Sequence, residues 1–148
     1  MKLENSVALV TGGASGLGEA VSRRIIEFGG KAAILDFDEE RGKQVEAELG
    51  PDAIFCITDV TDEISVQKAI DSTISAFGTV NTVINCAGVG TPKKVIDREG
   101  NPMPLEFFNK VIQINLVGTM NVIRLAAVSM IKNEPGTDGE RGVVINVA

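Results

Sequence analysis

Histidine, tryptophan and tyrosine are absent from the 148 residues of this chain, and cysteine occurs only twice. Without histidine, these residues cannot form a Ser-His-Asp or Cys-His nucleophile system, or a zinc site that uses histidine. Without tyrosine, they offer no phenol as a general acid. The side chains left for proton chemistry are carboxylates, lysines and two thiols.

The two cysteines, Cys56 and Cys86, are too few for a disulfide framework or a cysteine-based metal site. Each lies at the end of a predicted strand, and the topology predicted below separates those strands by roughly 14 Å. A disulfide tolerates a Cα separation of only about 7 Å. We therefore expect two free thiols, with Cys56 acting as a small buried hydrophobe.

Excess basic charge and long apolar runs are missing as well. The net charge of −6 argues against a nucleic-acid partner. We find no stretch that we expect to span a bilayer, and Met1–Asn5 is too short and polar to start a signal peptide. A cytoplasmic protein with no membrane partner is therefore expected, and 44% hydrophobic with 23% charged residues suits one globular α/β domain.

A glycine-rich stretch follows the first predicted strand. Val7–Val10 is an apolar run typical of a buried strand, and Thr11–Gly18 follows it directly, before an amphipathic helix. Glycine lets the backbone approach a pyrophosphate, and a helix N-terminus offers free N–H groups and a positive dipole end. Gly12, Gly16 and Gly18 follow a G-x-x-x-G-x-G spacing, which is neither the general dinucleotide fingerprint nor a P-loop. The order indicates a phosphate cradle, although an ordinary turn also uses glycine.

An acid ends the second predicted strand, Lys31–Asp36. Asp36 stands where a dinucleotide fold places the carboxylate that binds ribose hydroxyls. The next residue is Phe37, and no adjacent Arg or Lys would screen a 2′-phosphate, so we expect NAD rather than NADP. The alternative is that Asp36 belongs with the acidic cluster Asp38–Glu40 at the start of the next helix.

Strand and helix patterns alternate along the whole chain. Further strands are predicted at 53–57, 80–85 and 142–147, and helices at 15–28, 38–49, 61–77 and 105–131. In the first helix, Leu17, Val21, Ile25 and Phe28 form the stripe expected to face the sheet, and Thr61 is the expected N-cap of the third.

This alternation predicts a doubly wound parallel α/β sheet, a Rossmann fold with strand order 3-2-1-4-5. Its switch point lies between the first and fourth strands, where the glycine-rich stretch meets Asn85–Gly88. A ligand is expected there, at the carboxyl ends of the strands. On pattern alone, Asn85–Gly88 also fits an ordinary turn at the end of a strand.

The predicted helix Leu105–Ile131 is apolar on nearly every face. A helix that lies on one sheet needs only one apolar stripe. The extra face predicts a second partner, such as another subunit, unless the helix is wholly internal. The connection before it is unusually long and holds Lys93–Lys94, a pair that fits either a solvated loop or an anionic substrate.

Together, these motifs resemble the short-chain dehydrogenase/reductase family over the whole chain. Thr11–Gly18 is similar to the family's Thr-Gly-x-x-x-Gly-x-Gly, and Asp59-Val60 to its adenine-contacting pair. Asn85–Gly88 is similar to its Asn-Asn-Ala-Gly, with Cys86 replacing the second Asn. The long loop and two segments, Asn121–Leu125 and Asn133–Pro135, further resemble the type-2 3-hydroxyacyl-CoA dehydrogenase branch, which is similar to 17β-hydroxysteroid dehydrogenase type 10.

The resemblance implies an oxidoreductase that transfers a hydride between NAD and a secondary alcohol of the hydroxyacyl-CoA or hydroxysteroid class. It implies a tetramer or dimer formed through Leu105–Ile131, and it gives Asn115 the role of the tetrad Asn that supports a proton relay. The cofactor contacts that it implies are Gly12, Ser15, Gly16, Leu17, Gly18, Asp36, Asp59, Val60, Asn85, Cys86, Ala87 and Gly88.

The family's Ser and Tyr-x-x-x-Lys follow the fifth strand, and these residues contain no tyrosine. We therefore expect residues 1–148 to be the N-terminal, dinucleotide-binding part of a single domain, truncated after the fifth strand and inactive alone. One alternative is a complete non-catalytic nucleotide-binding or scaffold module. Another is a methyltransferase, which also carries an acid after its second strand but gives Asn85–Gly88 and Asn115 no role.

Overall fold

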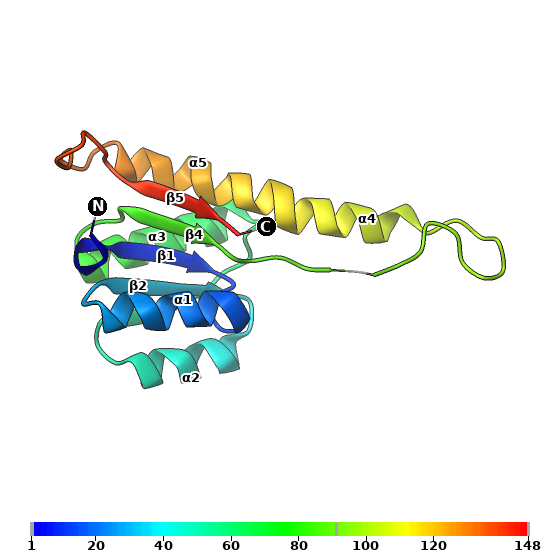
Figure 1. Ribbon diagram of the computed structural model, residues 1–148, viewed down its shortest axis with the longest axis horizontal. Coiled ribbons are helices and arrows are strands. Elements are labelled where there is room, and N and C mark those ends of the chain that lie inside the picture. Colours follow the sequence, from blue (N-terminus) through cyan, green and yellow to red (C-terminus); the bar gives the residue numbers. More distant parts are fainter. Residues whose placement is uncertain (1, 91, 148) are drawn as a thin grey trace.

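The computed structural model describes residues 2–90 and 92–147, which form a five-stranded parallel sheet with helices on both faces (Figure 1). The strands are β1 Val7–Thr11, β2 Lys31–Asp36, β3 Ala53–Ile57, β4 Thr82–Asn85 and β5 Val143–Asn146. Their order is β3-β2-β1-β4-β5, and every neighbouring pair is parallel. This confirms the predicted doubly wound topology.

The central strand, β1, is buried along its whole length. A strand covered by helices on both faces carries apolar residues without alternation, as the run from Val7 does. In the register of the sheet, Thr11 pairs with Leu35 on one side and Asn85 on the other. The residues that follow β1, β2 and β4 therefore emerge at one edge of the sheet.

Two helical layers cover the sheet. The helices are α1 Gly16–Glu27, α2 Glu39–Leu49, α3 Glu63–Phe77, α4 Leu105–Ile112 and α5 Thr119–Met130, with short helical segments at Leu3–Asn5 and Gln113–Gly118. On one face, Ile25 of α1 and Val45 of α2 lie in apolar clusters with the strands. On the other face, Val66 of α3 and Val122 of α5 pack with Leu9.

The buried stripe of α1 differs from the predicted one. Leu17 and Phe28 are 66% and 45% exposed, whereas Gly18, Ser22 and Ile25 are the buried positions. Small residues at the first two of these positions let the helix approach the turn after β1 more closely than a stripe of large side chains would. The expectation for Leu17 and Phe28 was therefore wrong, and Leu17 is left free to face the cleft described below.

The N-cap of α3 is Asp62 rather than the predicted Thr61. The side chain of Asp62 accepts a hydrogen bond from the backbone N–H of Ile64 at 2.9 Å. Thr61 instead donates its hydroxyl and its backbone N–H to one carboxylate oxygen of Asp59, at 2.7 and 2.8 Å. The chain thus forms a turn stabilised by Asp59 before the helix begins.

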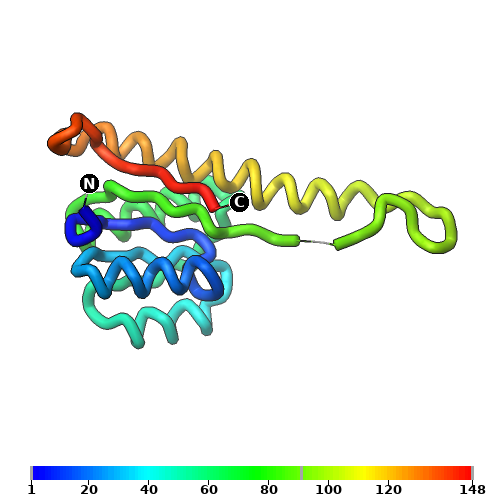
Figure 2. The backbone as a smooth tube through the Cα atoms, in the orientation of Figure 1, coloured from blue at the N-terminus to red at the C-terminus, as the bar shows by residue number. Residues whose placement is uncertain are grey.

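A single long helix runs through α4, the π-helical segment Gln113–Gly118 and α5. Its α5 half packs on the sheet through Val122, Ala126 and Met130. The α4 half and the loop before it extend past the carboxyl edge of the sheet (Figures 1 and 2). The large side chains left exposed between Leu116 and the end of the helix are Leu116, Val117, Met120, Val128 and Ile131.

The expectation that no segment could span a membrane was wrong on length and composition. The 26 residues Leu105–Met130 are long enough and apolar enough to do so. The reason is the apolar face that α5 does not turn toward the sheet. In the structure, α5 packs on the sheet through its other face, whereas α4 has no buried residue.

The assignment of the α3 cap predicts a difference between two neighbouring substitutions. Asp62→Ala is expected to lower the free energy of unfolding by about 1 kcal/mol, because the Ile64 N–H loses its acceptor. Thr61→Ala removes only a hydroxyl, since the backbone N–H still reaches Asp59, so its effect is expected to be smaller. Urea titrations followed by circular dichroism measure both, and a larger loss at Thr61 would contradict the assignment.

Candidate functional site

A cleft of about 670 Å³ opens at the carboxyl edge of the sheet, at the switch point between β1 and β4. Its walls come from the turn after β1, the ends of β2 and β3, the segment after β4, and α4. Of the predicted site residues, the cleft brings together Gly12, Ser15, Gly16, Leu17, Gly18, Asp36, Asp59, Val60, Cys86, Ala87 and Gly88.

The glycines of the turn are needed for close backbone approach. A Cβ on Gly18 would overlap the carbonyl oxygen of Gly12. A Cβ on Gly12 would stand 2.9 Å from the backbone nitrogen of Ala87, and Gly12 also has a positive φ of 63°. No other residue fits either position without moving the backbone, so the turn is built around these contacts.

Thr11 joins the end of β1 to the segment after β4. Its hydroxyl accepts hydrogen bonds from the backbone N–H groups of Cys86 and Ala87, at 3.1 and 3.0 Å. The N–H of Cys86 also donates to the carbonyl of Thr11 at 3.2 Å. The two chain segments that form the floor of the cleft are thereby fixed to each other.

The N-terminus of α1 faces this floor. Ser15 is the N-cap, but its side chain accepts no hydrogen bond from the first turn. The first N–H groups of a helix have no partner within the helix, so an uncapped terminus leaves them for a ligand. Together with the helix dipole, they suit an anion such as a phosphate.

Asp36 is tied to the same turn. One of its carboxylate oxygens accepts the N–H of Ala14 at 3.0 Å, and the other accepts the N–H of Asp38 at 3.1 Å. Asp36 also lines the cleft. The carboxylate is therefore positioned by the backbone on both sides while it faces a space that a ligand can enter.

A cation contacts Ala14, the residue whose N–H donates to this acid, which sequence adjacency did not reveal. Arg41 donates from Nε to the carbonyl of Ala14 at 3.2 Å and from Nη2 to Glu19 at 2.7 Å. Hydrogen bonds from Arg23 first, and then from Arg41, hold the pKa of Glu19 below its ordinary value. Glu19 therefore stays ionised, and its carboxylate forms an ion pair with Arg41.

The wall at the end of β3 is formed by Asp59 and Val60. The backbone N–H of Asp59 donates to the hydroxyl of Ser65 at 3.0 Å, in addition to the bonds that its carboxylate accepts from Thr61. Val60 is 8% exposed and belongs to the apolar cluster beneath α5. The polar contacts of Asp59 and the packing of Val60 thus hold this wall in place.

Cys86 and Cys56 are both free thiols, as expected. Burial raises the pKa of Cys86 above its ordinary value, and it raises the pKa of Cys56 to about 11, with the carboxylate of Glu46 adding to the shift. Both therefore stay protonated and unreactive near neutral pH. Cys86 takes part in the cleft as a neutral side chain.

Asn85 and Asn115 lie outside the lining of the cleft. Asn85 is 3% exposed and donates from Nδ2 to Oδ1 of Asn146 on β5 at 2.9 Å. Its own Oδ1 is the buried side-chain atom that finds no partner within residues 2–90 and 92–147. Asn115, in the π-helical segment, exchanges hydrogen bonds with both backbone groups of Val89, at 2.9 and 3.1 Å.

Six lining residues were missed by the sequence analysis: Leu35, Phe37, Thr58, Val89, Lys110 and Ile114. Phe37 carried a signal, because a large apolar residue that directly follows a strand-end acid lies beyond the buried part of the strand, and it is 76% exposed. Lys110 of α4 and Ile114 of the π-helical segment enter because the long helix passes the carboxyl edge of the sheet, which no local pattern showed. In the described part of the chain, no group of three or more Cys, Asp or Glu side chains is arranged to hold a metal ion.

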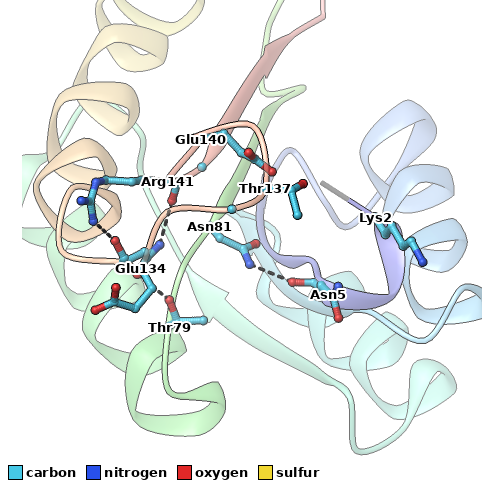
Figure 3. Close-up of a pocket in the computed structure, with 11 residues that line it drawn as sticks. Lys2, Asn5, Thr79, Asn81, Glu134, Thr137, Glu140 and Arg141 are labelled. Carbon is cyan, nitrogen blue, oxygen red and sulfur yellow. Dashed lines mark hydrogen bonds between the residues drawn. The ribbon is translucent and has the colours of Figure 1, made fainter.

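A second hollow, of about 590 Å³, lies at the opposite edge of the sheet (Figure 3). Its polar side chains bond to the chain itself: Asn81 donates to the carbonyl of Asn5 at 2.7 Å, and Thr79 donates to Asn133 at 2.8 Å. Asn133 donates in turn to the carbonyls of Val80 and Arg141. These contacts tie the N-terminal segment and the turn after α5 to residues 79–81, just before β4, which is a structural role.

Comparison with known proteins agrees with this geometry. A family model described as short chain dehydrogenase matches residues 6–148. The chain is 44% identical over 147 residues to 3-hydroxyacyl-CoA dehydrogenase type-2 of Drosophila melanogaster, covering 99% of this chain and 58% of that protein. It is 43% identical over 143 residues to the Homo sapiens protein of the same name, covering 96% and 55%.

Solved structures show the same fold. A crystal structure of 3-hydroxyacyl-CoA dehydrogenase type-2 from Mycobacterium avium matches with a TM-score of 0.92 and 39% identity, over 100% of this chain and 59% of that one. The 3-ketoacyl-(acyl-carrier-protein) reductase from Brucella melitensis, complexed with NADH, matches with a TM-score of 0.87 and 31% identity, over 99% and 58%. The chain thus spans somewhat more than half the length of these relatives.

The packing of the glycine-rich turn predicts unequal costs for two alanine substitutions. Gly16 has a φ of 53°, and no atom lies within 4 Å of the position that a Cβ would take, so Gly16→Ala is expected to cost about 1 kcal/mol of stability from backbone strain alone. Gly18→Ala drives a Cβ into the backbone of Gly12, so it is expected to cost about 3 kcal/mol or more. Thermal unfolding of the two variants gives the comparison, and equal costs would show that Gly18 does not pack as described.

Proposed function

Because the chain belongs to the short-chain dehydrogenase family, we propose that it binds NAD in the switch-point cleft and serves hydride transfer between NAD and a secondary alcohol. One observation carries the proposal. The open N-terminus of α1 and the carboxylate of Asp36 both face the cleft, and the N–H of Ala14 links the turn to the acid. A phosphate donor set and a ribose acceptor therefore stand on one rigid unit.

The cradle fits a dinucleotide pyrophosphate. Gly12 and Gly18 keep the turn free of side chains where the backbone must approach a ligand, since a Cβ at either position would meet backbone atoms. The first-turn N–H groups of α1 can donate to phosphate oxygens. Bound there, NAD supplies the hydride acceptor, and the chain's own residues hold and orient it.

The charges around Asp36 support NAD over NADP. A carboxylate accepts hydrogen bonds from the two hydroxyls of an unmodified ribose, whereas a 2′-phosphate would repel it. Arg41 is the cation that could offset this repulsion, but Glu19 engages it at 2.7 Å. The NADH complex of the Brucella melitensis reductase is in keeping with this proposal.

The substrate proposal rests on the relatives. Three of those described above carry the name 3-hydroxyacyl-CoA dehydrogenase type-2, so we propose a hydroxyacyl-CoA or hydroxysteroid alcohol as the substrate. Residues 1–148 contain no tyrosine or histidine, so the acid–base residue is proposed to be a Tyr-x-x-x-Lys tyrosine carried by a longer chain. In this proposal, Asn115 supports the proton relay and holds Val89 beside the cleft.

The proposal extends to a subunit partner. The exposed side chains Leu116, Met120 and Val128 form an apolar strip on the long helix, which we propose to be covered by another subunit in a dimer or tetramer. A cytoplasmic location and the absence of nucleic-acid and membrane partners stay predictions from composition.

Changing the charge of Asp36 tests the proposal. In the full-length protein, Asp36→Asn is expected to lower the ratio of kcat/KM with NAD to kcat/KM with NADP by about tenfold or more, because repulsion of the 2′-phosphate is lost. The assay follows reduced nicotinamide absorbance with a 3-hydroxyacyl-CoA as the alcohol.

Two further variants complete the test. Asp38→Asn removes a nearby charge that does not line the cleft, so the NAD to NADP ratio is expected to stay unchanged. Glu19→Gln removes the charge that pairs with Arg41. It is expected to raise kcat/KM with NADP and to leave kcat/KM with NAD unchanged. A wild-type protein without activity on hydroxyacyl-CoA or hydroxysteroid alcohols, or an unaltered ratio in Asp36→Asn, would contradict the proposal.

A further inference from the structure

Asn121 connects the long helix to the wall of the cleft. It lies in α5, is 7% exposed, and donates from Nδ2 to the carbonyl of Val60 at 2.9 Å. Val60 lines the cleft at the end of β3, whereas Asn121 does not line it. A buried amide that reaches a cleft residue 61 positions away is a contact between two separate parts of the fold.

Arg124 determines which way this amide points. Its Nε and Nη2 donate to Oδ1 of Asn121 at 3.1 and 2.8 Å. A guanidinium can only donate, so the amide oxygen must face Arg124, and the amide N–H₂ must then face the carbonyl of Val60. Glu63, in the first turn of α3, accepts from the same Nη2 at 2.5 Å and holds Arg124 in place.

Packing also holds the side chain of Val60 in place. A Cβ on Gly118 would stand 2.5 Å from Cγ2 of Val60, so the helix backbone lies directly against that side chain. Val60 also shares an apolar cluster with Val66 and Val122. The backbone of Val60 is thus bonded to α5, while its side chain packs in a cluster to which α3 and α5 both contribute.

We propose that Asn121 is a positioning residue for nucleotide binding, which holds the Asp59–Val60 wall at the adenine end of the cleft with Arg124 setting its amide orientation. This inference rests on the proposed function, in which NAD occupies the cleft. Its consequence is selective, because a displaced wall changes contacts with the adenosine half of the dinucleotide. The segment after β4 is held by its contacts with Thr11, which do not involve Asn121, so that part of the cleft is expected to keep its shape.

The test measures binding of NAD, AMP and nicotinamide mononucleotide to the full-length protein by calorimetry and ligand-observed NMR. Asn121→Asp keeps the shape and the acceptor for Arg124 but removes the donor to Val60. We expect it to weaken NAD and AMP by a similar factor, about fivefold to tenfold, and to leave nicotinamide mononucleotide unchanged. Arg124→Met is expected to give a smaller loss of the same pattern, and Arg124→Lys to recover part of it.

A matched control separates positioning from stability. Thr73 is fully buried in α3 and donates its hydroxyl to the carbonyl of Ala69 at 2.7 Å, away from the cleft. Thr73→Val is expected to lower the melting temperature while all three affinities stay the same. Because Arg124 lies at the surface, its variants give the comparison even if Asn121→Asp does not fold.

The possible results separate the role of Asn121 from the proposed binding of NAD. An unchanged ratio of AMP to nicotinamide mononucleotide affinity in the Arg124 and Asn121 variants would overturn the role of Asn121 and leave NAD binding in place. A wild-type protein that binds neither NAD nor AMP would overturn the proposed function and this inference with it. Selective loss of AMP and NAD, with no such loss in Thr73→Val, would establish the positioning role.

Discussion

The close contact between the turn after β1 and its neighbours is the constraint on which the site depends. Gly18 lies against the carbonyl of Gly12, and Gly12 lies against the backbone of Ala87. Thr11 adds hydrogen bonds across the same junction. The helix N-terminus, the turn and the segment after β4 are therefore one rigid unit, and the cleft exists because no side chain fills the space in front of it.

Asp36 links that unit to the end of β2. The same carboxylate that accepts the N–H of Ala14 faces the cleft, so one group both holds the turn and forms the proposed ribose site. In the proposed function, a free Arg41 would weaken the preference for NAD, and its hydrogen bond to Glu19 opposes that. The proposed preference for NAD therefore involves an ion pair outside the cleft as well as the acid that lines it.

Much of this could be predicted from the sequence, because the features concerned are local. The buried run of β1, the glycines of the turn and the acid at the end of β2 each show in a few adjacent residues. Contacts between distant segments could not be predicted in this way. The partner of Arg41, the bond from Asn121 to Val60 and the place of Lys110 in the cleft depend on how helices lie across the sheet.

The most direct test of NAD binding at the switch point is to locate the bound cofactor. In an NMR titration of the full-length protein with NAD, the largest backbone amide shifts are expected at Gly16–Gly18, Asp36 and Cys86–Gly88. The hollow at the opposite edge, around Thr79 and Asn133, should show no comparable shifts. Shifts confined to that hollow, or the absence of shifts at Gly16–Gly18 when NAD is bound, would contradict binding in the cleft.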